Sequence, residues 1–105
     1  MKSYRVRINK DAEEDLRRYT SYVRHKLKNP EAARSIALDF KETAKSLADI
    51  AESIRESESE QLLCRGLKRI NFRRHNYFLL FKLDIDTVFV TNMFHFSEDF
   101  ENNLK

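Results

Sequence analysis

The first part of the chain alternates apolar and basic residues, then changes to helical spacing. Tyr4, Val6 and Ile8 alternate with arginines, and this period of two predicts a strand with one buried face. From Ala12 onward the apolar spacing is that of an amphipathic helix, with Asn9 expected to cap its start. The predicted apolar stripe of this helix consists of Ala12, Leu16, Tyr19, Val23 and Leu27.

A second helix is predicted to begin at Pro30, with Asn29 as its cap. Proline fits the first helical turn but cannot continue a helix that precedes it. The apolar face of this helix is rich in alanine and consists of Ala33, Ile36, Ala37, Phe40, Ala44, Leu47 and Ala51. Small residues allow close packing, so we expect the two helices to form an antiparallel hairpin. Residues 55–61 lack apolar side chains and are expected to form an exposed connection.

The second half of the chain has a β-strand pattern. Three runs are rich in β-forming residues: Leu67 to Phe72, Tyr77 to Leu83 and Thr87 to Phe96. Residues 77–81 are all apolar, which is typical of a central strand covered on both faces. Residues 73–76 and 84–86 are expected to connect the three strands, the latter as a tight turn. The element order is β-α-α-β-β-β, which predicts an α+β fold in one domain spanning residues 1–105.

The composition excludes several classes of protein. The 105 residues contain one glycine and one cysteine, Cys64, which leaves no internal disulfide, no Cys-based zinc cluster and no glycine-rich nucleotide loop. One cysteine fits a reducing compartment, so a cytoplasmic location is expected. No apolar run approaches the ~20 residues of a membrane span, and the charged start is unlike a secretory signal. We therefore expect no cofactor and no membrane partner.

Positive charge is concentrated in one stretch. Residues 61–83 contain six Lys or Arg and no Asp or Glu, although the net charge of the chain is only +3. An acid-free basic stretch favours an anionic partner, such as RNA, DNA or an acidic protein. The alternative is a solvated strand face beside the acidic second helix, and charge alone leaves the two interpretations open.

Taken in order, these segments resemble the RelE/ParE superfamily of toxins from bacterial type II toxin–antitoxin systems. The residues that carry the resemblance over nearly the whole chain are Tyr4, Val6, Ile8, Ala12, Asp15, Leu16, Tyr22, Leu27, Asn29, Pro30, Ala32, Ala33, Phe72, Arg73, His75, Tyr77, Leu80, Phe81, Val88, Val90, Phe94, His95, Asp99, Phe100, Glu101 and Asn102. The resemblance implies a helical hairpin packed on a small twisted antiparallel sheet. It also implies a cognate antitoxin that wraps the toxin, growth inhibition when the antitoxin is lost, and room for a homodimer within the complex.

The superfamily contains two mechanisms. RelE-like members cut mRNA on the ribosome, whereas ParE-like members poison DNA gyrase. The long hairpin with Asn29 and Pro30 at its turn is more similar to the ParE side. RelE-like nucleases often place a tyrosine near the chain end, where this sequence has Phe96 and Phe100. The resemblance therefore favours gyrase over the ribosome with mRNA as the target, with metal-independent RNA cleavage as the alternative.

The candidate functional residues follow from these alternatives. Metal-independent RNA cleavage needs groups that move protons and cations that stabilise the phosphorane, so Arg73 and His95 are the catalytic candidates if the protein is a nuclease. The candidate contacts to nucleic acid or another target are Arg65, Lys68, Arg69, Arg74 and His75.

Each of these residues also has a purely structural interpretation. His95 is then bonded within the sheet edge or to the tail, and His75 is a solvated turn residue. Arg65 and Arg69 then share one strand face and pair with the acidic second helix.

The remaining reactive side chains receive structural interpretations. Cys64 is expected to be a small buried or half-buried residue. Glu98 and Asp99 are expected to form an acidic pair at the start of a short helix after Ser97. The three histidines are far apart in the sequence, so no metal site is predicted.

Overall fold

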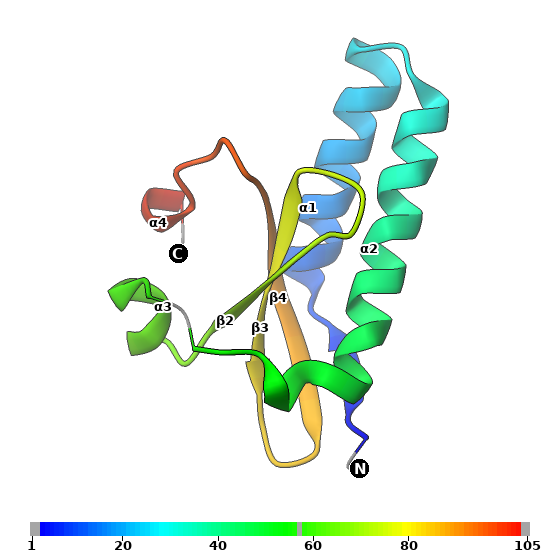
Figure 1. Ribbon diagram of the computed structural model, residues 1–105. Helices are drawn as coiled ribbons and strands as arrows, with labels where there is room; N and C mark the ends of the chain where they lie inside the picture. Colours follow the sequence, from blue (N-terminus) through cyan, green and yellow to red (C-terminus); the bar gives the residue numbers. More distant parts are fainter. Residues whose placement is uncertain (1–2, 57, 104–105) are drawn as a thin grey trace.

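The computed structural model describes residues 3–56 and 58–103 (Figure 1). The elements in chain order are β1 (Arg5–Ile8), α1 (Lys10–Ser21), a π-helical turn (Tyr22–Lys26), α2 (Pro30–Ile50), a 3-10 turn (Ala51–Ser53), α3 (Glu60–Cys64), β2 (Lys68–Asn71), β3 (Tyr77–Leu83), β4 (Thr87–His95) and α4 (Phe100–Asn103). The predicted β-α-α-β-β-β order is confirmed. The predicted end of the connection at residues 55–61 is wrong, because α3 begins there at Glu60; residue 57 of this connection lies outside the described residues.

The four strands form one sheet in the order β1-β4-β3-β2. Strands β2, β3 and β4 are antiparallel neighbours, as the short connections between them require. The expectation of a wholly antiparallel sheet is wrong for β1, which pairs in parallel with β4. A parallel pair needs a long crossover between its strands. The helical hairpin and the two other strands provide that connection here.

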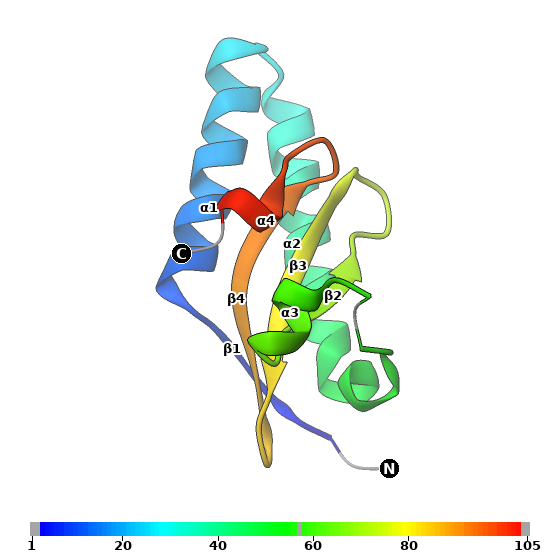
Figure 2. The ribbon, with the colours of Figure 1, turned by 90° about the vertical axis from the view of Figure 1, so that its left-hand side faces the viewer.

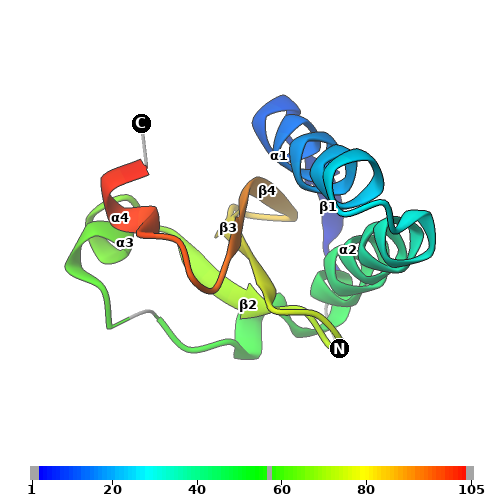
Figure 3. The same cartoon turned by 90° about the horizontal axis from the view of Figure 1, so that it is seen from above.

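The sheet lies between two helical layers of different size. Figures 1 and 3 show α1 and α2 on one face of the sheet, and Figure 2 shows α3 and α4 in front of the other. Central strand β3 is buried on both faces, as predicted, and the side chains of Leu79, Leu80 and Phe81 are fully buried. Leu79 and Phe81 belong to the core beneath the hairpin, whereas Leu80 packs with the smaller cluster beneath α3. Burial of each such side chain contributes about 1.5–3 kcal/mol.

Of three sequence predictions about the hairpin, the cap of α2 is confirmed, and the cap of α1 and the burial of Leu27 are not. The side chain of Asn29 caps α2 by accepting a hydrogen bond from the Ala32 amide at 3.0 Å, as expected. Asn9 precedes α1, but its side chain makes no capping bond. Leu27, predicted to be part of the apolar stripe, is 57% exposed. The π-helical turn before it bonds the Leu27 amide to the Tyr22 carbonyl, and this wider turn rotates Leu27 off the buried face.

The described helices include none that is both long and apolar enough to cross a lipid bilayer.

Candidate functional site

An apolar groove of about 840 Å³ lies between the hairpin and the edge of the sheet. Its apolar lining comes from three elements and consists of Val6 and Ile8 of β1, Leu16 of α1, and Ala37, Leu38, Phe40 and Ala44 of α2. Leu38 is 51% exposed, although it is a large aliphatic residue. The groove therefore presents apolar surface to solvent along the middle of α2.

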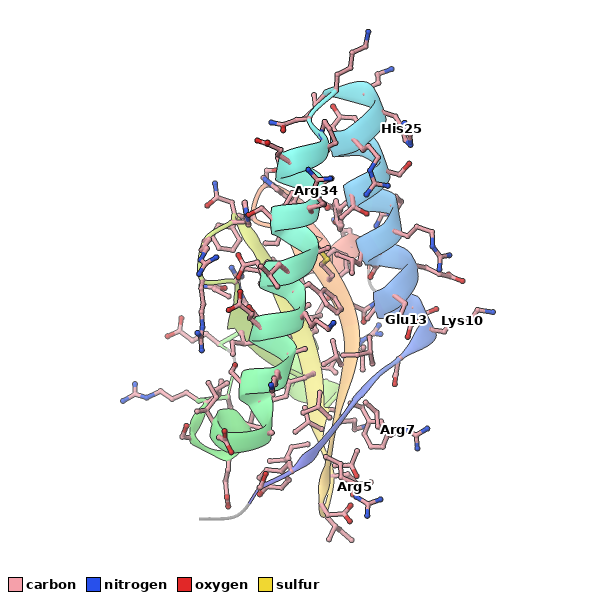
Figure 4. All side chains as sticks on the ribbon, turned by 90° about the vertical axis from the view of Figure 1, so that its right-hand side faces the viewer. Arg5, Arg7, Lys10, Glu13, His25 and Arg34 are labelled. Atoms are coloured by element: carbon pink, nitrogen blue, oxygen red, sulfur yellow. The ribbon has the colours of Figure 1, made fainter. Side chains whose placement is uncertain are left out.

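The rim of this groove is strongly basic. Its charged lining residues are Arg24, Arg34, Lys41 and Lys45, against one acid, Glu13. Figure 4 shows Glu13 on α1 and Arg34 on α2, the helices that flank the groove, and Arg5 and Arg7 extending from β1. An apolar floor with a basic rim is suited to a peptide that carries apolar anchors and acidic residues.

Strand β1 adds a backbone edge beside the groove. The amides of Arg5 and Asn9 bond to the carbonyls of Asp86 and Val90 on the β4 side. Because backbone groups alternate in direction along a strand, those of Val6 and Ile8 point away from β4. In the part of the chain that the structure describes, β1 has no strand on that side.

At one end of the sheet, a buried carboxylate holds the loop between β2 and β3. Asp39 of α2 is only 1% exposed, and its two oxygens accept hydrogen bonds from three consecutive amides. These come from Arg73 at 3.2 Å, Arg74 at 2.9 Å and His75 at 3.0 Å. The arginine side chains of the loop are exposed, and Arg74 lies 4.0 Å from Glu42. The loop backbone is therefore fixed while its cations face solvent.

His75 is not the solvated turn residue that the sequence suggests. Its Nε2 lies 2.8 Å from the hydroxyl of Ser35 on α2, and the residue is only partly exposed. The sequence predicts an isolated polar turn at residues 73–76. In the structure, hydrogen bonds to Asp39 hold this turn against α2.

His95 is hydrogen-bonded to the segment that follows β4, as its structural interpretation predicts. Its Nδ1 lies 2.8 Å from the hydroxyl of Ser97, and its ring meets Tyr77 edge-on at 4.9 Å between centroids. Glu98 accepts hydrogen bonds from the Tyr19 hydroxyl and the His95 amide. The predicted acidic pair at a helix start is therefore wrong for Glu98, because α4 begins later, at Phe100.

Arg69 lies on the sheet face opposite the hairpin and is stacked on aromatic rings. Its guanidinium carbon is 3.8 Å from the centre of the Phe78 ring and 5.4 Å from that of Phe96. Its Nε donates to Asn71 at 2.9 Å, and burial lowers the pKa of the guanidinium. Lys68 is adjacent in sequence but pairs with Phe81, which places it on the hairpin face.

Two predictions about the segment before β2 are wrong. Arg65 does not share a strand face with Arg69, because it follows α3 as its C-cap and β2 starts at Lys68. Cys64 is exposed rather than buried, because α3 turns Leu62 inward instead.

The predicted residues therefore form two groups, with Arg69 on β2 between them. Arg73, Arg74, His75 and His95 lie at one end of the sheet, where the Phe96 amide bonds to the Asn76 carbonyl at 2.9 Å. Arg65 and Lys68 flank the start of β2 at its other end.

Comparison with known families identifies the fold. The sequence model of the ParE toxin of the type II toxin–antitoxin system parDE matches residues 6–100. The chain belongs to the ParE toxin family. A chain from the chromosomal ParDE system of P. aeruginosa is 19% identical, with a TM-score of 0.73 over 89% of this chain and 96% of that one. A chain of the toxin–antitoxin complex RelBE2 from Mycobacterium tuberculosis is 25% identical, with a TM-score of 0.58 over 89% and 98%. No curated protein sequence matches the chain.

Two features of this ParE-family toxin escape sequence reasoning. The basic rim draws three cations from α2 and Arg24 from the π-helical turn before it, and these residues are spread over 22 positions of a chain segment of mixed charge. Asp39 did leave a signal, since it falls on the buried stripe of α2 between Ile36 and Phe40. A lone carboxylate on an apolar helix face requires donors from another segment.

Proposed function

We propose that the protein is a ParE-like poison of DNA gyrase that acts in the cytoplasm and is kept inactive by a cognate antitoxin. The match of the ParE toxin family over residues 6–100 carries this proposal. The two candidate histidines do not decide between the mechanisms, because each has one ring nitrogen hydrogen-bonded to a serine and carries a second ring nitrogen.

The groove between α1, α2 and β1 is the proposed docking site of the antitoxin. The similar solved structures come from a ParDE system and a RelBE2 toxin–antitoxin complex, so proteins of this fold assemble with antitoxins. In this chain the apolar floor would receive aliphatic side chains of a bound helix. The rim arginines and lysines would then contact its acidic residues.

A ribosome-dependent mRNA endonuclease is the second candidate function. It is favoured by the likeness to the RelBE2 chain and by the placement of Arg73, His75 and His95 at one end of the sheet. In this case Arg73 would stabilise the developing phosphorane charge and His95 would transfer protons. The other predicted contacts to RNA or to another target are Arg65, Lys68, Arg69 and Arg74.

Two parallel assays with the purified toxin separate these functions. In the first, gyrase supercoils relaxed plasmid in the presence of ATP, and the gyrase proposal predicts loss of supercoiling with accumulation of cleaved DNA. In the second, a purified translation reaction receives a defined mRNA, and primer extension maps new 5′ ends. Ribosome-dependent cleavage with unaffected supercoiling would overturn the gyrase proposal and establish the nuclease.

Substitutions at the sheet end make the assignment residue-specific. If the protein poisons gyrase, Arg73→Ala and His95→Ala each reduce potency less than substitutions on the hairpin surface. If it is a nuclease, each abolishes mRNA cleavage while leaving antitoxin binding and folding intact. Exposed Arg55, in the connection before α3, provides a matched arginine control as Arg55→Ala.

A further inference from the structure

The end of the helical hairpin extends beyond the sheet and is dense in positive charge (Figures 1 and 4). Residues 16–30 contain five Lys or Arg and no Asp or Glu, so they form a second acid-free stretch besides residues 61–83. Three of these cations, Arg24, Lys26 and Lys28, are exposed at the turn itself. The ion pairs of the described residues involve none of the three. The hairpin tip, residues 22–28, therefore presents positive charge to solvent.

Two large apolar side chains are exposed among these cations. Tyr22 is 55% exposed and Leu27 is 57% exposed. The Leu27 amide bonds to the Tyr22 carbonyl at 3.2 Å, so the two residues lie on adjacent turns of the helix. Single exposed apolar residues are common on protein surfaces, whereas an apolar patch rimmed by polar residues is typical of an interaction site. The tip has this second arrangement.

The backbone of the tip is held in an unusual conformation. Residues 22–26 form the π-helical turn, and Lys28 has a φ of 53°. Glycine is the usual residue at such a position, because a side chain there costs free energy. The Asn29 amide fixes the geometry by bonding to the carbonyl of buried Val23 at 3.0 Å. Strained residues and π-helical turns concentrate at functional sites, and the strain here places a cation at the end of the hairpin.

Most of the tip lies outside the groove that we assign to the antitoxin. Arg24 lines that groove, whereas Tyr22, Lys26, Leu27 and Lys28 do not. The tip therefore offers a surface for a second partner, and substitutions at these four positions leave the lining of the groove unchanged.

We propose that the hairpin tip binds an acidic protein surface of gyrase, with Tyr22 and Leu27 as apolar anchors and the tip lysines paired to carboxylates. Buried tyrosines are frequent hot spots of protein interfaces, and complementary charge speeds encounter and fixes orientation. The phosphates of a DNA duplex would pair with the cations but would leave Tyr22 and Leu27 without apolar contact. A protein partner fits both kinds of residue. This inference rests on the proposed function, because it identifies the surface through which the toxin reaches gyrase.

Binding of the purified full chain to immobilised gyrase, measured by biolayer interferometry, tests the proposal. Tyr22→Ala and Leu27→Ala are each expected to raise the Kd about tenfold, mainly through faster dissociation. Lys26→Glu is expected to slow association and to reduce its dependence on salt. Two controls lie at the other end of the hairpin and are expected to bind as the wild type does (Figure 4). Ile50→Ala, at a site 40% exposed, matches the apolar truncations, and Lys10→Glu matches the charge reversal.

Lys28→Gly separates a binding role from a structural one. Glycine relieves the left-handed conformation, so the midpoint of thermal unfolding is expected to rise, while loss of the cation is expected to weaken gyrase binding. Higher stability with unchanged affinity is the result expected of a purely structural residue and would contradict the proposed contact.

The same measurements distinguish failure of this inference from failure of the gyrase proposal. If the wild-type toxin binds gyrase and inhibits supercoiling, but folded Tyr22→Ala and Leu27→Ala bind equally well, the tip is not the contact surface. The inference is also overturned if these two substitutions weaken antitoxin binding as much as gyrase binding. A third contrary result is a DNA duplex that binds the toxin as tightly as gyrase does and loses that affinity in Lys26→Glu. If the wild-type toxin neither binds nor inhibits gyrase, both proposals are overturned. Circular dichroism verifies the folding of each variant.

Discussion

The buried carboxylate of Asp39 accepts a hydrogen bond from the backbone amide of Arg74 at 2.9 Å, across 35 residues of sequence. The amides on either side of Arg74 bond to the same carboxylate. A loop amide buried without an acceptor would cost free energy comparable to a lost hydrogen bond. One side chain of α2 thus satisfies the turn between β2 and β3, and couples the hairpin to the end of the sheet that presents Arg73 and Arg74.

Asp39→Asn is expected to destabilise the protein by about 2–4 kcal/mol. The amide is the same size, but it replaces one acceptor oxygen with a donor that faces donors of the loop. Urea denaturation followed by circular dichroism measures the change. Glu42→Gln, one helical turn away, removes only the exposed 4.0 Å ion pair with Arg74 and should cost less than about 0.5 kcal/mol. Equal stability of the two variants would show that the carboxylate is not what holds the loop.

The sequence predicts local elements well and long-range partners poorly. The strand β3 is correctly predicted as a central strand because Tyr77 to Phe81 are apolar without interruption. The parallel pairing of β1 with β4 depends on where the hairpin crosses the sheet, and no local pattern encodes that path. Similarly, the loop amides that bond to Asp39 lie more than 30 residues away.

For the candidate site, too, the sequence predicts the local feature but not the arrangement in space. The acid-free stretch correctly draws attention to residues 61–83, but strand alternation puts Lys68 and Arg69 on opposite faces. Three cations of the basic rim lie on α2, and Arg24 of the π-helical turn joins them only when the hairpin folds.

Tyr77 should make stability fall at alkaline pH. Burial raises the pKa of its phenol above the ordinary value of 10.0, so the folded protein holds a proton that the unfolded chain releases. Stability is then complete below about pH 10 and is lost as the pH rises through the folded-state pKa. Tyr77→Phe removes this loss, which is measured as a smaller decrease in the urea midpoint between about pH 8 and about pH 10.5. Tyr22→Phe, at a site 55% exposed, should leave the decrease unchanged; an identical pH dependence in all three proteins would contradict the assignment.

Gly66 joins α3 to β2 in a conformation that favours glycine. Its φ is +68°, and a Cβ built there would lie 3.6 Å from Cε of Lys82, an ordinary contact. Gly66→Ala should therefore cost about 1 kcal/mol through the backbone alone. Lys28, with φ of 53° at the turn of the hairpin, provides the converse test, since Lys28→Gly should stabilise. Thermal unfolding of both variants measures the two effects, and shifts of the same sign would refute the backbone explanation.

The proposed docking site predicts that Leu38 contacts the antitoxin. Leu38 is 51% exposed in the free toxin, so Leu38→Glu should leave folding nearly unchanged. In the complex the new carboxylate would be buried against apolar side chains and beside the acidic residues expected of the antitoxin. We expect the Kd for the antitoxin, measured by titration calorimetry, to rise more than about tenfold, a cost of about 1.4 kcal/mol.

The same substitution should separate neutralisation from toxicity. Neutralisation is scored as the difference in growth with and without the antitoxin, because the hairpin surface is also expected to contact gyrase and Leu38→Glu can lower toxicity by itself. Cells that express the Leu38→Glu toxin should gain less growth from the antitoxin than cells that express the wild-type toxin. Ile85→Glu introduces the same charge at a remote, 83% exposed turn and should remain neutralised. If Leu38→Glu were neutralised equally well, the antitoxin would have to bind elsewhere. The free edge of β1 at Val6 and Ile8 would then be the next surface to test, since an added strand needs only backbone groups and tolerates a changed side chain in the groove.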